Sequence, residues 1–289
     1  MSTVQALKLL ADTASRRCAD RVERRTVAGV PALVAGRGPA FVFANACTPR
    51  GIEEPALAAF LGGVASAGLH AIAPELPDVR HGVVTPATVD ALVRVAEDSD
   101  GALVLAGAST GGALAILAAA DPRLAGRVAL VSAIAPFADL ANVLRLATTG
   151  HYADEGIFRR FPVEPRLRWV AERSLLALGD GTALAALLEN DQPERFNELY
   201  AALPGGVRAA VELLSPARAL SRVGARVDVA VDPWDTFFPP AEARALERAG
   251  AYVTRTPALR HVKPRIGPGL ARFVRFTDRM LLGRPALAS

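Results

Sequence analysis

The stretch Gly107-Ala108-Ser109-Thr110-Gly111 decides how this sequence folds. An apolar run at 102–106 precedes it, and a run at 112–120 that favours a helix follows it. Strand, tight turn and helix in this order are the context in which a Gly-x-Ser-x-Gly pattern forms a nucleophile elbow. Residues without Cβ on either side of the serine let the strand and the helix approach closely. We therefore expect Ser109 to project from the end of a sheet, at the amino end of a helix whose dipole favours negative charge.

Outward from this stretch, short apolar runs alternate with helical patterns. This alternation predicts a mostly parallel sheet with helices on both faces. Strands are predicted at 24–27, 31–34, 40–44, 70–73, 102–106, 128–132, 226–231 and 252–256, and helices at 55–67, 88–97, 112–120, 240–250 and 269–282. The uncharged segment 101–120 is about as long as a bilayer span. Because its central glycines interrupt a continuous helix, we predict a buried strand and a buried helix there.

The alternation stops between residues 137 and 215, where the pattern is helical and strand periodicity is absent. Helices are predicted there at 140–146, 165–178, 182–188, 194–202 and 206–214. We therefore predict an α/β core of residues 1–136 and 216–289 that carries a helical insertion at 137–215. The core begins with an amphipathic helix at residues 1–22, which packs on the body or on a second copy of the chain. The second arrangement would give a homo-oligomer.

Composition excludes several classes of function. The basic residues are scattered, without a basic stripe or interleaved aromatics, so no nucleic-acid partner is expected. Cys18 and Cys47 form no Cys-x-x-Cys pair and stand near no histidine cluster, which predicts neither a metal site nor a disulfide and suits a reducing cytosol. The N-terminus lacks the apolar region of a signal peptide. We thus expect a cytoplasmic protein without a transmembrane segment. Residues 107–112 lack the Gly-x-Gly-x-x-Gly spacing of dinucleotide sites, and no cofactor is expected.

From about residue 24 onward, the order of elements and the Gly-x-Ser-x-Gly turn make the chain resemble the α/β-hydrolase fold family. The resemblance implies a catalytic serine, then an aspartate or glutamate, then a histidine, in chain order. It also implies that the helical insertion is a cap over the active site. Ser109 would be the nucleophile. Of the histidines His70, His81, His151 and His261, only His261 follows the last strand, where the family places its general base.

The acid is expected in the segment 231–240. The family's acid loop usually has an aspartate four residues before a proline that opens a helix, and Asp235 and Pro239 have that spacing. Asp232, closer to the end of the strand, is the alternative, and either aspartate could instead cap a turn or the next helix. In such a triad His261 takes the proton of the serine, and the carboxylate orients the imidazole and stabilises its charged form.

The loop after the third predicted strand would complete an oxyanion hole. In the family one donor is the backbone N–H after the nucleophile, here that of Thr110, and the other comes from this loop, which often begins His-Gly. Asn45 and Ala46 replace His-Gly here, and Ala46 or Cys47 would supply the second donor. Loss of one such donor costs roughly 2.7–4 kcal/mol. The Cys47 side chain is interpreted as packing rather than as a second nucleophile. Asn45 and His81, at the carboxyl edge of the sheet, are candidates for substrate binding.

These residues favour a serine hydrolase that cleaves carboxylic esters or thioesters through an acyl-enzyme on Ser109. The apolar and aromatic residues of the insertion, among them Phe158, Phe161 and Trp169, indicate a small to medium apolar substrate. Two alternatives stay open, because a fold does not determine a reaction. One is acyl transfer or other non-ester chemistry on the same fold. The other is a catalytically degenerate protein that only binds ligands, which the altered Asn45-Ala46 pair favours.

Overall fold

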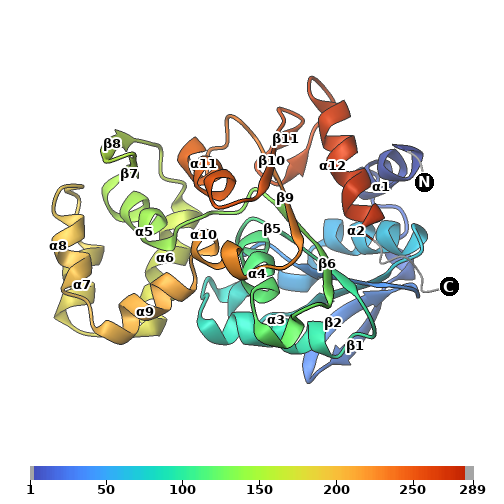
Figure 1. The fold of residues 1–289 in the computed structure, drawn as a ribbon, viewed down its shortest axis with the longest axis horizontal. Helices are drawn as coiled ribbons and strands as arrows, with labels where there is room; N and C mark the ends of the chain where they lie inside the picture. Colours follow the sequence, from blue (N-terminus) through green and yellow to red (C-terminus); the bar gives the residue numbers. More distant parts are fainter. Residues whose placement is uncertain (1–2, 284–289) are drawn as a thin grey trace.

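The centre of the molecule is a large twisted sheet. In this computed structural model, which describes residues 3–283, eight strands follow the order β1-β2-β4-β3-β5-β6-β9-β10 (Figure 1). β2 runs antiparallel to β1 and β4, and every other neighbouring pair is parallel. The strands are β1 (Glu23–Val27), β2 (Val30–Ala35), β3 (Ala40–Ala44), β4 (His70–Pro74), β5 (Leu103–Ala108), β6 (Val128–Ile134), β9 (Arg226–Val231) and β10 (Tyr252–Arg255). The expected fold class, an α/β protein with a mostly parallel sheet, is confirmed.

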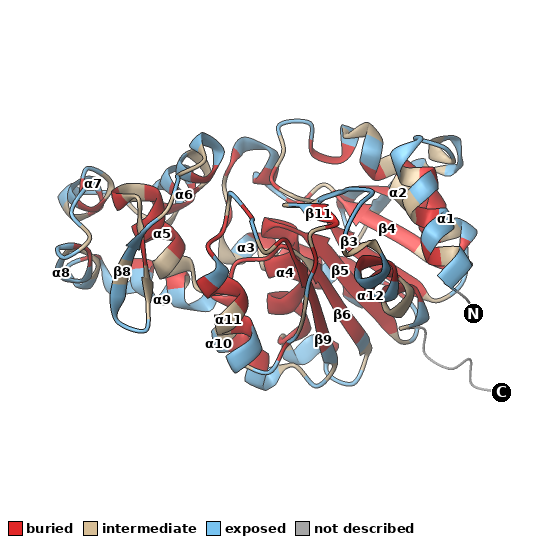
Figure 2. Ribbon diagram, turned by 90° about the horizontal axis from the view of Figure 1, so that it is seen from above, coloured by how far each residue is buried: buried red, intermediate tan, exposed pale blue. Residues whose placement is uncertain are grey.

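Helices cover both faces of this sheet, because alternate side chains of each strand point to opposite sides. On β3, Phe41 and Phe43 join one apolar cluster, whereas Val42 and Ala44 join another. The first face is covered by α1 (Thr3–Ala14), α2 (Pro55–Ser66) and α12 (Leu270–Leu282). The second face is covered by α3 (Pro86–Glu97), α4 (Thr110–Ala119), α10 (Pro216–Ala219) and α11 (Pro240–Arg248). Figure 2 shows the central strands buried between these layers.

The apolar segment 101–120 forms β5 and α4, as the sequence predicts. Every residue of both elements is buried. This burial explains why the segment is apolar on all sides. Within residues 3–283, no helix combines the length and the apolar character that a membrane crossing needs.

The N-terminal helix is shorter than the stretch 1–22 allowed. α1 ends at Ala14, because Arg16 and Cys18 adopt positive φ values of 55° and 63°, which a right-handed helix does not accommodate. The buried face of α1 packs on α2 and α12 of the same chain, and Leu9 is 2% exposed there. Of the two arrangements considered for this helix, the structure shows the one in which it packs on its own body.

Between β6 and β9 the chain leaves the sheet and forms a second group of helices with its own apolar core (Figure 1). These helices are α5 (Leu140–Thr149), α6 (Pro165–Leu178), α7 (Thr182–Leu188), α8 (Phe196–Ala201) and α9 (Gly205–Leu213). An antiparallel hairpin of β7 (His151–Asp154) and β8 (Ile157–Arg160) interrupts them, so the expectation of a purely helical segment is corrected. Glu155 and Gly156 both have positive φ, as a two-residue type I′ turn requires. Strands of four residues are too short for alternation to stand out in the sequence.

A buried glutamate fastens this helical group to the core. Glu242 on α11 accepts the backbone N–H groups of Ala138 at 2.7 Å and Asp139 at 3.0 Å, and the side-chain amide of Asn142 at 2.7 Å. Burial raises the pKa of Glu242 to about 7, against the lowering effect of these three hydrogen bonds. The remaining short elements are η1 (Ala19–Arg21), η2 (Gly51–Glu53), η3 (Val79–His81), η4 (Pro122–Leu124), η5 (Leu220–Arg222), β11 (Leu259–Arg260) and β12 (Lys263–Pro264).

Candidate active site

Ser109 lies in a sharp turn between β5 and α4. Its backbone angles, φ 53° and ψ −124°, are strained for a residue with a side chain. A Cβ added to Gly107 would lie 2.2 Å from the carbonyl oxygen of Gly111, and one added to Gly111 would lie 2.0 Å from that of Ala44. Both glycines of the motif are therefore required sterically. The second contact also places the carboxyl end of β3 against the first turn of α4.

Three side chains from separate loops form one hydrogen-bonded chain at the carboxyl edge of the sheet. Ser109 Oγ lies 2.9 Å from His261 Nε2, and His261 Nδ1 lies 2.8 Å from Asp235 Oδ2. When Nδ1 carries the proton, it donates a hydrogen bond to the carboxylate. Nε2 then accepts a hydrogen bond from the serine hydroxyl. The side chains of His261 and Asp235 are 12% and 6% exposed, so water screens their interaction little.

The two candidate aspartates have different roles in the structure. Asp235 Oδ1 accepts the backbone N–H groups of Phe237 at 2.7 Å and Phe238 at 3.3 Å, which leaves Oδ2 facing His261. Asp232 Oδ1 instead accepts the N–H of Trp234 at 3.0 Å and closes its own turn. The structure thus places Asp235, and not Asp232, beside the histidine.

Phe237 and Phe238 form an aromatic wall beside the imidazole, which the sequence did not predict. The ring of Phe237 stacks on that of His261, with centroids 4.2 Å apart and an interplanar angle of 20°, and Phe238 lies 5.7 Å away at 57°. Phe238 also contacts Phe137, and their apolar cluster includes Phe161 from the chain after the hairpin. The only signal in the sequence was the pair of phenylalanines two residues after the aspartate.

The loop after β3 is shaped by the residue that replaces the expected histidine. Asn45 donates from its side-chain amide to the carbonyl of Gly51 at 2.8 Å and accepts the N–H of Ala46 at 2.9 Å. The amide of Asn45 and the N–H of Ala46 are therefore both engaged within the loop. The N–H of Cys47 has no hydrogen-bond partner among the described residues. Thr110 is the first residue of α4, and the N–H groups in the first turn of a helix have no acceptor within the helix.

Two other side chains that the sequence singled out lie outside this hydrogen-bonded chain. The thiol of Cys47 donates to the carbonyl of Val79 at 2.8 Å, and burial raises its pKa to about 11, so it is protonated at neutral pH. The His81 ring is exposed, and its charged neighbour is Asp78, 4.0 Å away. Within residues 3–283, no group of histidine, cysteine, aspartate and glutamate side chains is arranged to hold a metal ion.

Comparison with known proteins identifies the class of fold. No protein-family model and no curated sequence matches the chain. Among solved structures, an esterase from the bacterial hormone-sensitive lipase family has a TM-score of 0.56 and 18% identity, over 98% of this chain and 99% of that one. A hormone-sensitive lipase homologue from a metagenome library has a TM-score of 0.54 and 15% identity, over 98% of this chain and 92% of its own.

A peptidase shares the same core. The acylaminoacyl peptidase of Pyrococcus horikoshii has a TM-score of 0.56 and 13% identity, over 91% of this chain. The chain spans only 40% of that peptidase. At such identities these likenesses establish architecture and not activity. Together with the sheet order and the turn at Ser109, they show that the protein has the α/β-hydrolase fold.

Proposed function

We propose that this protein is a serine hydrolase that cleaves carboxylic esters or thioesters, with Ser109 as nucleophile, His261 as general base and Asp235 as the orienting acid. The observation that carries the proposal is the unbroken hydrogen-bonded chain from the serine hydroxyl through the imidazole to a fixed carboxylate. A serine hydroxyl is a weak nucleophile unless a base within hydrogen-bond reach accepts its proton. Here the base is 2.9 Å away.

The acylation step follows from this arrangement. His261 Nε2 takes the hydroxyl proton while Ser109 Oγ attacks the substrate carbonyl carbon, and the carbonyl oxygen becomes an oxyanion. We assign its two donors to the N–H of Thr110 and the N–H of Cys47, because the N–H of Ala46 is already bonded to Asn45. The bond to the leaving alcohol or thiol then breaks, and the proton on His261 passes to that leaving group.

Deacylation reverses these roles. A water molecule gives its proton to His261 and attacks the acyl carbon, and the carboxylic acid leaves as Ser109 regains its proton. Asp235 orients the imidazole and stabilises the imidazolium in both steps. Asn45 acts within this proposal by shaping the donor loop, since its amide is used by Gly51 and Ala46.

We further propose that residues 137–215 act as a cap on the core made of residues 1–136 and 216–289. The apolar cluster that includes Phe137, Phe238 and Phe161 supports this assignment, because it joins the insertion to the wall beside His261. These apolar side chains suit a substrate whose acyl or alcohol group is apolar and of small to medium size.

The test is the change Ser109→Ala with a panel of p-nitrophenyl esters and acyl thioesters of increasing chain length. Turnover and labelling by a fluorophosphonate should fall to background while the circular dichroism spectrum stays unchanged. Ser15→Ala, an exposed serine outside the site, is the matched control. Wild-type protein that is folded but never labelled would favour the ligand-binding alternative. Products formed with alcohol as a competing acceptor separate hydrolysis from acyl transfer.

A further inference from the structure

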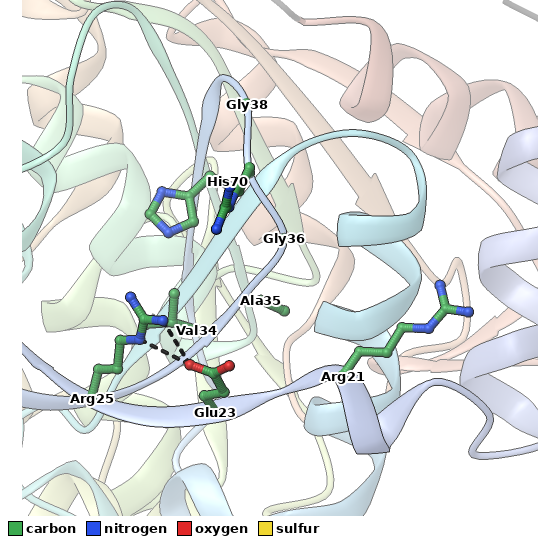
Figure 3. A pocket seen from close by; sticks show the side chains of 9 residues that line it. Arg21, Glu23, Arg25, Val34, Ala35, Gly36, Gly38 and His70 are labelled. Atoms are coloured by element: carbon green, nitrogen blue, oxygen red, sulfur yellow. Dashed lines mark hydrogen bonds and ion pairs between the residues drawn. The ribbon is translucent and has the colours of Figure 1, made fainter.

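A cavity lies at the opposite edge of the sheet from Ser109. It has a volume of about 510 Å³ and opens beside the start of β4, where His70 lies (Figure 3). The carboxyl end of β3 lies against the turn at Ser109, whereas its amino end pairs with His70. At about 3.3 Å per residue the length of β3 separates the two edges by roughly 16 Å. The cavity is therefore distinct from the candidate active site.

The cavity carries excess positive charge. Its lining includes Arg21, Arg25 and Arg37 against a single carboxylate, that of Glu23. Glu23 is engaged by Arg25, whose Nε and Nη2 lie 3.1 and 2.7 Å from the same carboxylate oxygen. Arg21 reaches away toward the hydroxyl of Ser66 at 2.7 Å. Among the residues the structure describes, no carboxylate lies within ion-pair distance of Arg21 or Arg37.

His70 adds a polar group without a positive charge. Its ring is half-buried in the cavity wall, and no described residue forms a hydrogen bond with it. Figure 3 shows His70 and Arg25 among the residues that line the cavity. Burial, and then the nearby charge of Arg25, lower the pKa of His70. The ring is therefore neutral at physiological pH, where it can donate one hydrogen bond and accept another.

Two glycines fix the backbone turn that carries Arg37. Gly36 and Gly38, on either side of it, have φ values of 73° and 121°. A Cβ on Gly36 would lie 2.6 Å from the carbonyl oxygen of Leu69, and one on Gly38 would lie 2.5 Å from that of Gly68. This close packing fixes the turn against the chain that leads into β4. The turn therefore fixes the position of the Arg37 backbone, while its exposed side chain stays free to reach a ligand.

From these features we propose that this cavity is a binding site for a small organic phosphate, a phosphomonoester whose phosphate is held by Arg37 and Arg25 beside His70. Guanidinium groups match the geometry of phosphate oxygens and bind them through paired hydrogen bonds. The cavity falls in the size range of small-molecule sites and exceeds what inorganic phosphate alone fills. Val34 and Ala35 line the part of the cavity that would be left for the organic group.

Calorimetric titration with adenosine monophosphate, inorganic phosphate and adenosine tests the site without reference to catalysis. Saturable binding of the monophosphate is expected, with weaker binding of inorganic phosphate and none of adenosine. Arg37→Gln should weaken the binding of the monophosphate about tenfold or more, since it removes a charge-assisted contact. Arg208→Gln, which removes the same charge from an exposed position on α9, should leave the affinity within about twofold.

A second variant changes affinity in the opposite direction. Glu23→Gln removes the competing carboxylate from Arg25 and should tighten binding of the monophosphate at low salt. The proposal is overturned if the wild-type protein shows no saturable binding. It is also overturned if Arg37→Gln and Arg208→Gln weaken binding equally, because that result means general attraction to a basic protein, or if Glu23→Gln weakens it.

Discussion

Ser109 is held in a strained backbone conformation by contacts that only glycine neighbours allow. The strain places its hydroxyl at the end of β5, where His261 and Asp235 arrive from later loops. The positive φ of His261, 53°, shows that the histidine too sits at a tight turn, between β11 and β12. Single residues at strained turns thus produce the geometry on which the proposed chemistry depends.

Replacing Asp235 and Asp232 one at a time distinguishes the roles of the two side chains. Asp235→Asn should lower kcat/KM for an activated ester by about 10⁴-fold, because an amide at this position favours the wrong imidazole tautomer. Asp232→Asn retains the oxygen that accepts the N–H of Trp234 and should keep near wild-type activity. Steady-state kinetics on both variants measure the difference. Equal losses would mean that the carboxylate beside His261 has no special role.

The steric role of Gly111, two residues after Ser109, can also be tested by substitution. Gly111→Ala places a methyl group 2.0 Å from the carbonyl oxygen of Ala44, so one element must move. The expected cost is about 1–3 kcal/mol of unfolding free energy, together with loss of fluorophosphonate labelling. Gly206→Ala, in α9 with nothing near the added carbon, should be neutral or stabilising by up to about 1 kcal/mol. Urea denaturation compares the two.

At the scale of elements, α11 connects the core with the inserted segment. Besides the contacts of Glu242, Arg244 on this helix donates to Asp154 in the β7–β8 hairpin at 2.6 Å, and Arg248 lies 3.5 Å from Glu155 in the same hairpin. Glu242 itself is buried, and its contacts hold the chain where it enters α5. The hairpin and α5 are therefore both fastened to the helix that follows Asp235.

The buried carboxyl group makes stability depend on pH. The pKa of Glu242 is about 7 in the folded protein, above its ordinary value of 4.5. A raised pKa means that the folded state binds the proton more tightly, so this stabilisation is complete below about pH 4.5 and is lost as the pH rises through about 7. The difference corresponds to roughly 3 kcal/mol.

Glu242→Gln should remove this dependence. Between pH 5 and pH 8 the wild-type protein is expected to lose up to about 3 kcal/mol more unfolding free energy than the variant. Denaturant titrations at both values measure the contrast. Parallel pH profiles for the two proteins would show that Glu242 does not titrate in this range.

At the scale of the whole molecule, α1 completes the layer formed by α2 and α12. Leu9→Ala should cost about 2–5 kcal/mol, because it removes a fully buried side chain. Leu7→Ala, on the same helix but 45% exposed, should change stability by less than about 0.5 kcal/mol. Thermal unfolding at several protein concentrations tests whether the stability lost in Leu9→Ala comes from contacts within the chain or between copies. A cost that shrinks on dilution would mean that α1 contacts a second copy of the chain instead, because a contact between copies no longer contributes once they dissociate.

Much of this architecture is legible in the sequence. Strand β9 and helices α6 and α7 have the bounds that the apolar pattern predicts, since periodicity and nearby prolines are local properties. The hairpin was missed because its strands are short, and the length of α1 was overestimated because positive φ values at Arg16 and Cys18 leave no compositional mark. The cavity lined by Arg37 and His70 was missed because it forms only when separate strands meet.

The strand–turn–helix at Ser109 and the alternation that builds the sheet can be predicted from the sequence alone, because short-range sterics and side-chain periodicity control both. The folded chain is needed to show that Asp235 rather than Asp232 lies beside His261, and that Ala46 N–H is already bonded to Asn45. Ser109 and His261 are 152 positions apart in the chain. A contact over that separation depends on how β5, β9 and β10 align in the sheet, and no local pattern encodes it.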